Sequence, residues 1–117
     1  MEPNLKQRSE DYALRIIKMY SALPYTTESE VLGKQVLRSG TSVGANYREA
    51  CRARSKAEFV SKLGDSLKEL DETDYWLSLI VKAGLVPEKR LESLIQETGE
   101  LMAIFVSSIN TAKGNKK

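Results

Sequence analysis

Residues 34–64 read KQVLRSGTSVGANYREACRARSKAEFVSKLG, and this stretch decides the fold. Small and apolar residues recur in it at steps of four, three, four and three: Val36, Gly40, Val43, Tyr47 and Ala50. Such steps follow one face of an α-helix. The run from Ser39 to Gly44, taken alone, is typical of a loop, because a glycine inside a helix costs about 1 kcal/mol relative to alanine. Since the spacing keeps its phase through the run, we expect one continuous helix whose small residues let a second helix approach closely.

The residues before this stretch predict where two helices begin and end. Thr27-x-x-Glu30 has the form of a capping box, in which a hydroxyl and a carboxylate each accept a hydrogen bond from a free backbone amide. We therefore expect the helix to begin near Thr27. Upstream, apolar residues at helical spacing predict a first helix from about Asn4 to Ala22, which Pro24 ends.

A third helix is expected to begin at Ser55, because Ser55-x-x-Glu58 forms a second capping box. Its expected core face advances by three or four residues at a time: Val60, Leu63, Leu67, Leu70, Asp74, Leu77 and Val81. Asp74 is the one polar member of this series. Gly84 is a natural C-terminal cap for the helix.

A fourth helix is expected to begin at Pro87, whose missing amide hydrogen is not needed in a first turn, and to fray near Asn110. Its core face continues the same spacing: Leu91, Leu94, Thr98, Leu101, Phe105 and Ser108. Short links between long amphipathic helices predict an all-α fold, an antiparallel up-down-up-down four-helix bundle. We expect residues 1–112 to form a single domain and residues 113–117 to form a disordered basic tail.

Charge is distributed unevenly along the 117 residues, although the formal net charge is only +2. Residues 34–62 hold seven lysines and arginines against two glutamates, a net charge of +5. Residues 63–100 hold four cations against nine carboxylates, a net charge of −5. A chain with this polarity can attract an outside polyanion or a second copy of itself.

The sequence contains no histidine, which excludes the Glu-x-x-His pairs of di-iron bundles and the histidine-based nucleophile pairs of hydrolases. The single cysteine, Cys51, excludes an internal disulfide, and its place in a helical pattern predicts a packing role. The third helix carries an acidic cluster: Glu69, Asp71, Glu72 and Asp74. These carboxylates could bind a divalent cation, but a solvated or ion-paired surface is favoured. We expect no enzymatic activity, no metal and no cofactor.

The sequence also bears on location. No apolar run approaches the roughly 18 residues that a membrane span needs. The N-terminal residues lack the basic start and apolar stretch of a signal peptide. We therefore expect a cytoplasmic protein that makes no membrane contact.

Four cations near the junction of the second and third helices are candidates for contact with nucleic acid: Arg48, Arg52, Arg54 and Lys56. We expect Arg48, Arg52 and Lys56 to line one face, with Arg54 beside it; Arg48 and Arg52 lie about one helical turn apart. Such a row can follow phosphates without reading base sequence. Tyr47 is the only aromatic nearby, and its place in the apolar stripe argues against base stacking. Two structural roles stay open for the same cations: a solvated face, or ion pairs with the acidic third helix of a neighbouring copy.

Apolar side chains on the third helix extend beyond what one bundle seam requires: Tyr75, Trp76 and Leu79. Trp76 lies roughly 100° around the helix from the core residue Leu77. Because aromatic residues are common at subunit interfaces, we expect these three residues to form a homo-oligomer contact. Packing of Trp76 inside the monomer is the open alternative.

Two blocks of sequence carry a resemblance to a known family. The first is Leu37-Arg38-Ser39-Gly40-Thr41-Ser42-Val43-Gly44-Ala45-Asn46, followed at the family's spacing by Glu49-Ala50, Ser55-Lys56 and Phe59. The second is Ser66-Leu67-Lys68-Glu69-Leu70, with Glu72-Thr73 and Tyr75-Trp76-Leu77. On these residues the chain resembles the 23S rRNA intervening-sequence proteins, a family of four-helix bundles, over nearly its whole length.

The resemblance implies a ring-shaped homo-oligomer, typically a pentamer, and carries no enzymatic activity with it. Some members are encoded within inserts of ribosomal RNA genes. A relative of similar fold, the accessory protein of diversity-generating retroelements, works with a reverse transcriptase and nucleic acid, although this chain is less basic. The resemblance thus favours a non-enzymatic oligomeric scaffold that binds RNA or DNA, and a purely protein-binding assembly module is the alternative.

Overall fold

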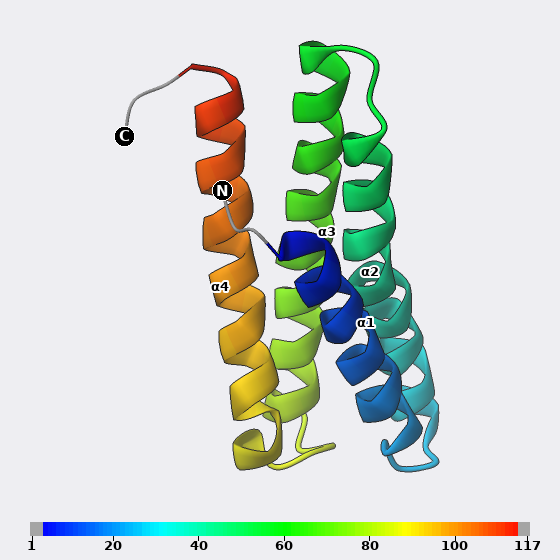
Figure 1. The fold of residues 1–117 in the computed structure, drawn as a ribbon. Helices are drawn as coiled ribbons and strands as arrows, with labels where there is room; N and C mark the ends of the chain where they lie inside the picture. The colour runs from blue at the N-terminus through cyan, green and yellow to red at the C-terminus, as the bar shows by residue number, and fades with distance from the viewer. Residues whose placement is uncertain (1–3, 115–117) are drawn as a thin grey trace.

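In the computed structural model, which describes residues 4–114, the chain forms four helices joined by short connections (Figure 1). The helices are α1 (Leu5–Ser21), α2 (Thr27–Cys51), α3 (Lys56–Lys82) and α4 (Glu88–Ala112). Successive helices run in opposite directions along the bundle, as Figure 1 shows. The predicted all-α, antiparallel up-down-up-down four-helix bundle is confirmed.

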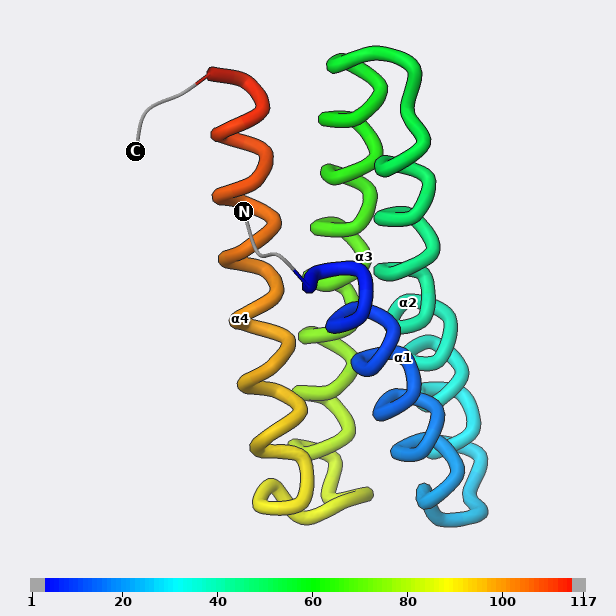
Figure 2. Tube along the Cα trace, viewed as in Figure 1, coloured from blue at the N-terminus to red at the C-terminus, as the bar shows by residue number. Residues whose placement is uncertain are grey.

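The four helices contribute unequally to the bundle. α2 and α3 form the central antiparallel pair, α1 packs mainly on α2, and α4 packs mainly on α3. α1 has 17 residues whereas the other helices have 25 to 27, and α1 makes little direct contact with α4. The trace in Figure 2 shows α1 running obliquely across the bundle, so that its C-terminal end lies away from α4.

The glycines of α2 explain how closely α1 and α2 pack. A Cβ atom added at Gly40 would lie only 2.7 Å from Cγ1 of Ile16, which is fully buried. One added at Gly44 would lie 3.4 Å from the backbone oxygen of Ser9. The expected continuous helix through Ser39–Gly44 is confirmed, and so is the close approach of a second helix.

The core face of α3 is rotated slightly from its predicted position. Leu63, Leu70 and Leu77 are fully buried, as expected, but the buried polar residues are Ser66 and Thr73, and Asp74 is only partly buried. The reason is a hydroxyl contact with α2. Thr73 Oγ1 lies 2.7 Å from Ser39 Oγ, and this contact turns the small polar face of α3 toward α2. The remaining predicted members of the face are only partly buried: Val60, Leu67 and Val81.

The two predicted capping boxes have different outcomes. Ser55 caps α3 as expected, since its hydroxyl accepts a hydrogen bond from the Glu58 amide at 3.0 Å. α2 begins at Thr27 as expected, but its cap is Thr26 and not Thr27, because Thr26 has the extended backbone of a cap and its hydroxyl accepts from the Ser29 amide at 3.1 Å. Glu30 forms an ion pair with Lys34.

The turn between α3 and α4 is built around Gly84, as predicted. Gly84 has φ +76°, the amide of Leu85 donates to the carbonyl of Ile80, and the Gly84 amide donates to Val81. These two bonds form a Schellman motif. Pro87 precedes α4 as its N-cap and is not its first helical residue, and α4 extends past Asn110 to Ala112.

The predicted tail, residues 113–117, lies largely outside the described residues. Lys113 caps α4, and Gly114 follows it with φ +81°. None of the helices within residues 4–114 is both long enough and apolar enough to cross a membrane.

Candidate nucleic-acid interface

The four candidate cations surround the connection between α2 and α3, at one end of the bundle (Figure 1). Arg48 lies in the last turn of α2, Arg52 is the C-cap of α2, and Lys56 is the first residue of α3. Arg54 lies between the two helices. All four residues are exposed. The structure therefore brings together the group that the sequence singled out, although Lys56 belongs to α3 and not to the face of α2.

These four cations differ from those that the fold uses internally. Among residues 4–114, the cations that form ion pairs with carboxylates are Arg8, Lys34, Arg38 and Lys62. The two acids near the connection are already occupied. The Glu49 carboxylate lies 2.7 Å from Lys62 Nζ, and the Glu58 carboxylate accepts from the backbone amide of Arg54 at 3.0 Å. The positive charge of the four candidates is thus turned to solvent.

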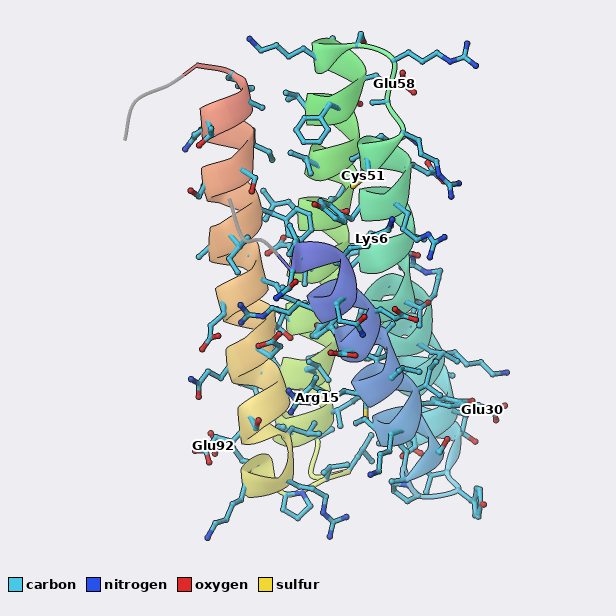
Figure 3. All side chains as sticks on the ribbon, in the orientation of Figure 1. Lys6, Arg15, Glu30, Cys51, Glu58 and Glu92 are labelled. Carbon is cyan, nitrogen blue, oxygen red and sulfur yellow. The ribbon has the colours of Figure 1, made fainter. Side chains whose placement is uncertain are left out.

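The folded chain adds Lys6 of α1 to this surface. A cleft of about 490 Å³ lies between α1 and α2, and Lys6 and Arg48 both line it. Figure 3 labels Lys6 at the start of α1, beside α2. The cleft is also lined by Ser9, Glu10, Thr41 and Gly44. Sequence reasoning missed Lys6, because nothing in the local spacing of the first helix reveals which part of α2 it will meet.

We define the basic end as Arg48, Arg52, Arg54, Lys56 and Lys6 together. The C-terminus of α4 reaches the same end of the bundle in Figure 1, where Lys113 caps the helix. A surface of this kind offers several cations that are not neutralised, which is what a chain of phosphates requires.

Two of the four acidic residues in the α3 cluster, Glu69 and Glu72, form ion pairs within the chain. Arg38 of α2 forms ion pairs with Glu69, at 3.3 Å, and with Glu72. The hydrogen bond with Glu72 raises the pKa of Arg38, so this cation stays charged. Within residues 4–114, no group of three or more histidine, cysteine or carboxylate side chains is arranged to hold a metal ion.

The three residues predicted to form a subunit interface lie on or near the surface of α3. Tyr75 is 57% exposed, whereas Trp76 and Leu79 are half-buried and Trp76 packs against the core. The rings of Tyr75 and Trp76 meet edge to face, with centroids 5.1 Å apart. The indole Nε1 of Trp76 is buried without a hydrogen-bond acceptor among the described residues. The role of this surface in assembly stays a prediction.

Cys51 is exposed, so its predicted packing role was wrong. It is the last residue of α2, and Figure 3 shows it near the top of the helix. Its neighbour Tyr47 is buried and packs edge to face on Phe105. Burial, together with a hydrogen bond to Cys51, raises the pKa of Tyr47 to about 12.

The fold and its basic end define a small all-helical bundle protein with an unneutralised cationic surface. The family model described as 23S rRNA-intervening sequence protein matches residues 2–107, and the chain belongs to this family. The family predicted from the two sequence blocks is confirmed.

A solved structure supports the same assignment. The chain is similar to a crystal structure of a protein of unknown function from the S23 ribosomal protein family of Bacteroides thetaiotaomicron, with 40% sequence identity and a TM-score of 0.84. The match covers 89% of this chain and 96% of that one. No curated protein matches the sequence. Neither the family nor this structure indicates an enzyme.

Proposed function

We propose that this protein is a non-enzymatic, oligomeric scaffold that binds RNA or DNA through its basic end. One observation carries the proposal. The cations around the α2–α3 connection are exposed and have no carboxylate partner among residues 4–114, while the nearby acids Glu49 and Glu58 are held elsewhere. The membership in a family described by a ribosomal RNA feature agrees with it.

The chemistry of the basic end favours phosphate contact over base recognition. Arginine and lysine side chains bind phosphates and release condensed counterions, which gives affinity without sequence selectivity. Base stacking needs exposed aromatic rings, whereas near the α2–α3 connection Tyr47 is buried against Phe105 and Phe59 is partly buried against the core. Binding should therefore discriminate little between sequences and should weaken steeply as salt is added.

Assembly would strengthen such binding. A pentameric ring would present five copies of a modest patch at once, and linked sites gain avidity without any new contact. Tyr75 and Trp76 support an interface on α3, because the Tyr75 ring is exposed and meets the half-buried Trp76 ring edge to face, which forms an aromatic surface. A protein-binding assembly module without nucleic acid is the second candidate, and the same two residues favour it.

The test is a charge-matched pair of variants. The first carries Arg48→Gln, Arg52→Gln, Arg54→Gln and Lys56→Gln. The second removes the same charge from exposed cations at the opposite end of the bundle: Lys18→Gln, Lys82→Gln, Lys89→Gln and Arg90→Gln. Binding to single-stranded RNA and to duplex DNA is measured by fluorescence anisotropy over a range of salt concentrations.

The first variant should lose binding and the second should retain it. Each phosphate contact contributes about 0.9 to the slope of log K against log salt for duplex DNA. Lys6→Gln alone removes one phosphate contact and should therefore reduce the magnitude of this slope by about 0.9. Equal losses in both variants would reduce the effect to net charge. No binding by the unchanged protein at low salt would favour the assembly module.

Assembly is measured separately by light scattering. The unchanged protein should have a mass near that of a pentamer, compared with 13.1 kDa for one chain. Tyr75→Ser should lower this mass with little loss of helicity, because Tyr75 is exposed, whereas Trp76→Ala should also disturb the packing of the core. A monomer at micromolar concentration would reject the oligomeric scaffold. Dissociation of the basic-end variant would show instead that its cations join subunits.

A further inference from the structure

The divergence of α1 from α4 leaves a cleft at the end of the bundle opposite the basic end. Nη2 of Arg15 donates to Oγ of Ser93 at 2.9 Å, and among residues 4–114 this is the last hydrogen bond between the two helices in that direction. Beyond it the helices separate, as Figure 2 shows, and a cleft of about 340 Å³ opens. Ligand pockets in proteins typically begin at about 300 Å³.

The floor of this cleft is apolar. Leu91 and Leu94 of α4 and Val86 of the preceding turn form it, and each is only 3% to 5% exposed. Met19 of α1 is half-buried on the opposite wall, and Ala22, the C-cap of α1, also lines the cleft. A floor of this kind favours a hydrocarbon body and has little to offer a hydrated phosphate.

The rim of the cleft is cationic. Arg15, Lys18 and Arg90 line it, and no carboxylate does. Figure 3 shows Arg15 between α1 and α4, whereas Glu92 lies on the outer side of α4. Long cationic side chains can lay their methylene stems along apolar surface and keep their charged ends at the mouth. An apolar floor under three cations is complementary to a molecule with one anionic head and an apolar body.

We propose that this cleft binds a small amphipathic carboxylate, such as a medium-chain alkyl carboxylate. Its head accepts hydrogen bonds from Arg15, Lys18 and Arg90, and its chain covers Leu91 and Leu94. Charge-assisted hydrogen bonds of this kind are stronger than neutral ones, and burial of the chain removes apolar surface from water. The site is independent of the proposed nucleic-acid surface, because the two lie at opposite ends of the bundle and share no residue.

The test uses decanoate, below the concentration at which it forms micelles, and follows the backbone amide signals of the intact protein by NMR. Saturable shifts should appear in the C-terminal half of α1 and the first turns of α4. Decylamine, which has the same chain and the opposite charge, and acetate, which has the head alone, should each bind at least about tenfold more weakly, because either lacks one half of the complementarity. Equal affinity for decanoate and decylamine would overturn the proposal.

Two variants locate the site. Lys18→Gln with Arg90→Gln removes charge from exposed positions and should weaken decanoate binding roughly tenfold. Ala22→Trp should block the cleft, and because Ala22 is exposed the fold should tolerate it. Arg52→Gln with Lys56→Gln, at the basic end, is the charge-matched control and should leave decanoate binding unchanged. Shifts that persist in the Ala22→Trp variant, or equal weakening by the control, would overturn the assignment.

Discussion

α1 makes two very different contacts with its neighbours. Against α2 it packs so closely that glycine is required, since an added Cβ at Gly40 would overlap the buried Ile16. Against α4 it is held mainly by polar side chains that span a wider gap. Nε of Arg8 lies 2.8 Å from Glu97 Oε2, and Tyr12 Oη lies 2.6 Å from Thr98 Oγ1. We call these the close seam and the wide seam.

The difference teaches how one short helix can both complete a core and leave a cleft. The glycines of α2 have no side chain, so the backbone of α1 can approach closely. Dispersion attraction and apolar burial increase as the two backbones approach. Where the backbone of α1 lies farther from α4, long polar side chains span the gap between the two helices. Thr98 donates its proton to the Leu94 carbonyl at 2.9 Å, so Tyr12 is the donor in their shared bond. Past Arg15 and Ser93 no such link remains among the described residues, and the cleft begins.

The largest effect should come from breaking the close seam. Gly40→Val would place three carbons against Ile16 and should lower the free energy of unfolding by about 3 kcal/mol. Gly99→Ala is the matched control, because an added Cβ at this helical glycine meets nothing within 4 Å. It should raise the stability by about 1 kcal/mol through helix propensity alone. Urea unfolding followed by circular dichroism measures both, and a neutral Gly40→Val would mean that the seam is not close in solution.

The second largest effect should be a loss of stability at alkaline pH, which tests the wide seam. Burial raises the pKa of Tyr12 well above its ordinary value of 10.0. The stability from its neutral phenol is therefore complete below pH 10 and is lost as the pH rises further, at about 1.4 kcal/mol per pH unit. Unfolding curves at pH 8 and pH 11 should show this loss. Tyr12→Phe should reduce the loss, whereas Tyr25→Phe should not, because Tyr25 is fully exposed. Identical pH dependence in both variants would contradict the burial of Tyr12.

The smallest effect concerns the ion pairs of the wide seam. Arg8→Gln should cost about 0.5 kcal/mol at low salt, and less when salt screens the charges, because the pair with Glu97 is only partly buried. Lys34→Gln breaks an exposed pair within α2 and serves as the control. Thermal melts at two salt concentrations would detect the difference. If Arg8→Gln costs no more than the control, the polar contacts do not hold α1 to α4.

Comparison of the helix ends shows which local features can be predicted from the sequence. Ser55 was identified as the cap of α3 because a hydroxyl and a carboxylate three residues apart suffice to satisfy free amides. Thr26 was missed, because Thr27 has the same chemistry and the spacing to Glu30 favours it. Only the extended backbone at Thr26 distinguishes the two. Gly84 was identified because few other residues adopt its positive φ.

The candidate site divides in the same way. Four of its cations are close in sequence and were found together, since a short connection keeps them together in space. Lys6 was not found, because it joins the surface only through the packing of α1 on α2. The pairing of Arg38 with Glu69 and Glu72 was likewise invisible, since the sequence allowed the acids to meet a neighbouring copy equally well.

The sequence by itself determined the number of helices, the continuity of α2 through its glycines, the cap at Ser55, the turn at Gly84 and the family. These depend on residues within a few positions of one another, where periodicity and backbone chemistry act directly. Only the tertiary structure decided that Thr73 and not Asp74 enters the core, that Cys51 is exposed, and that α1 leaves α4. Each depends on how far one helix rotates or tilts against another, and that is set by the combined packing of side chains distant in the chain.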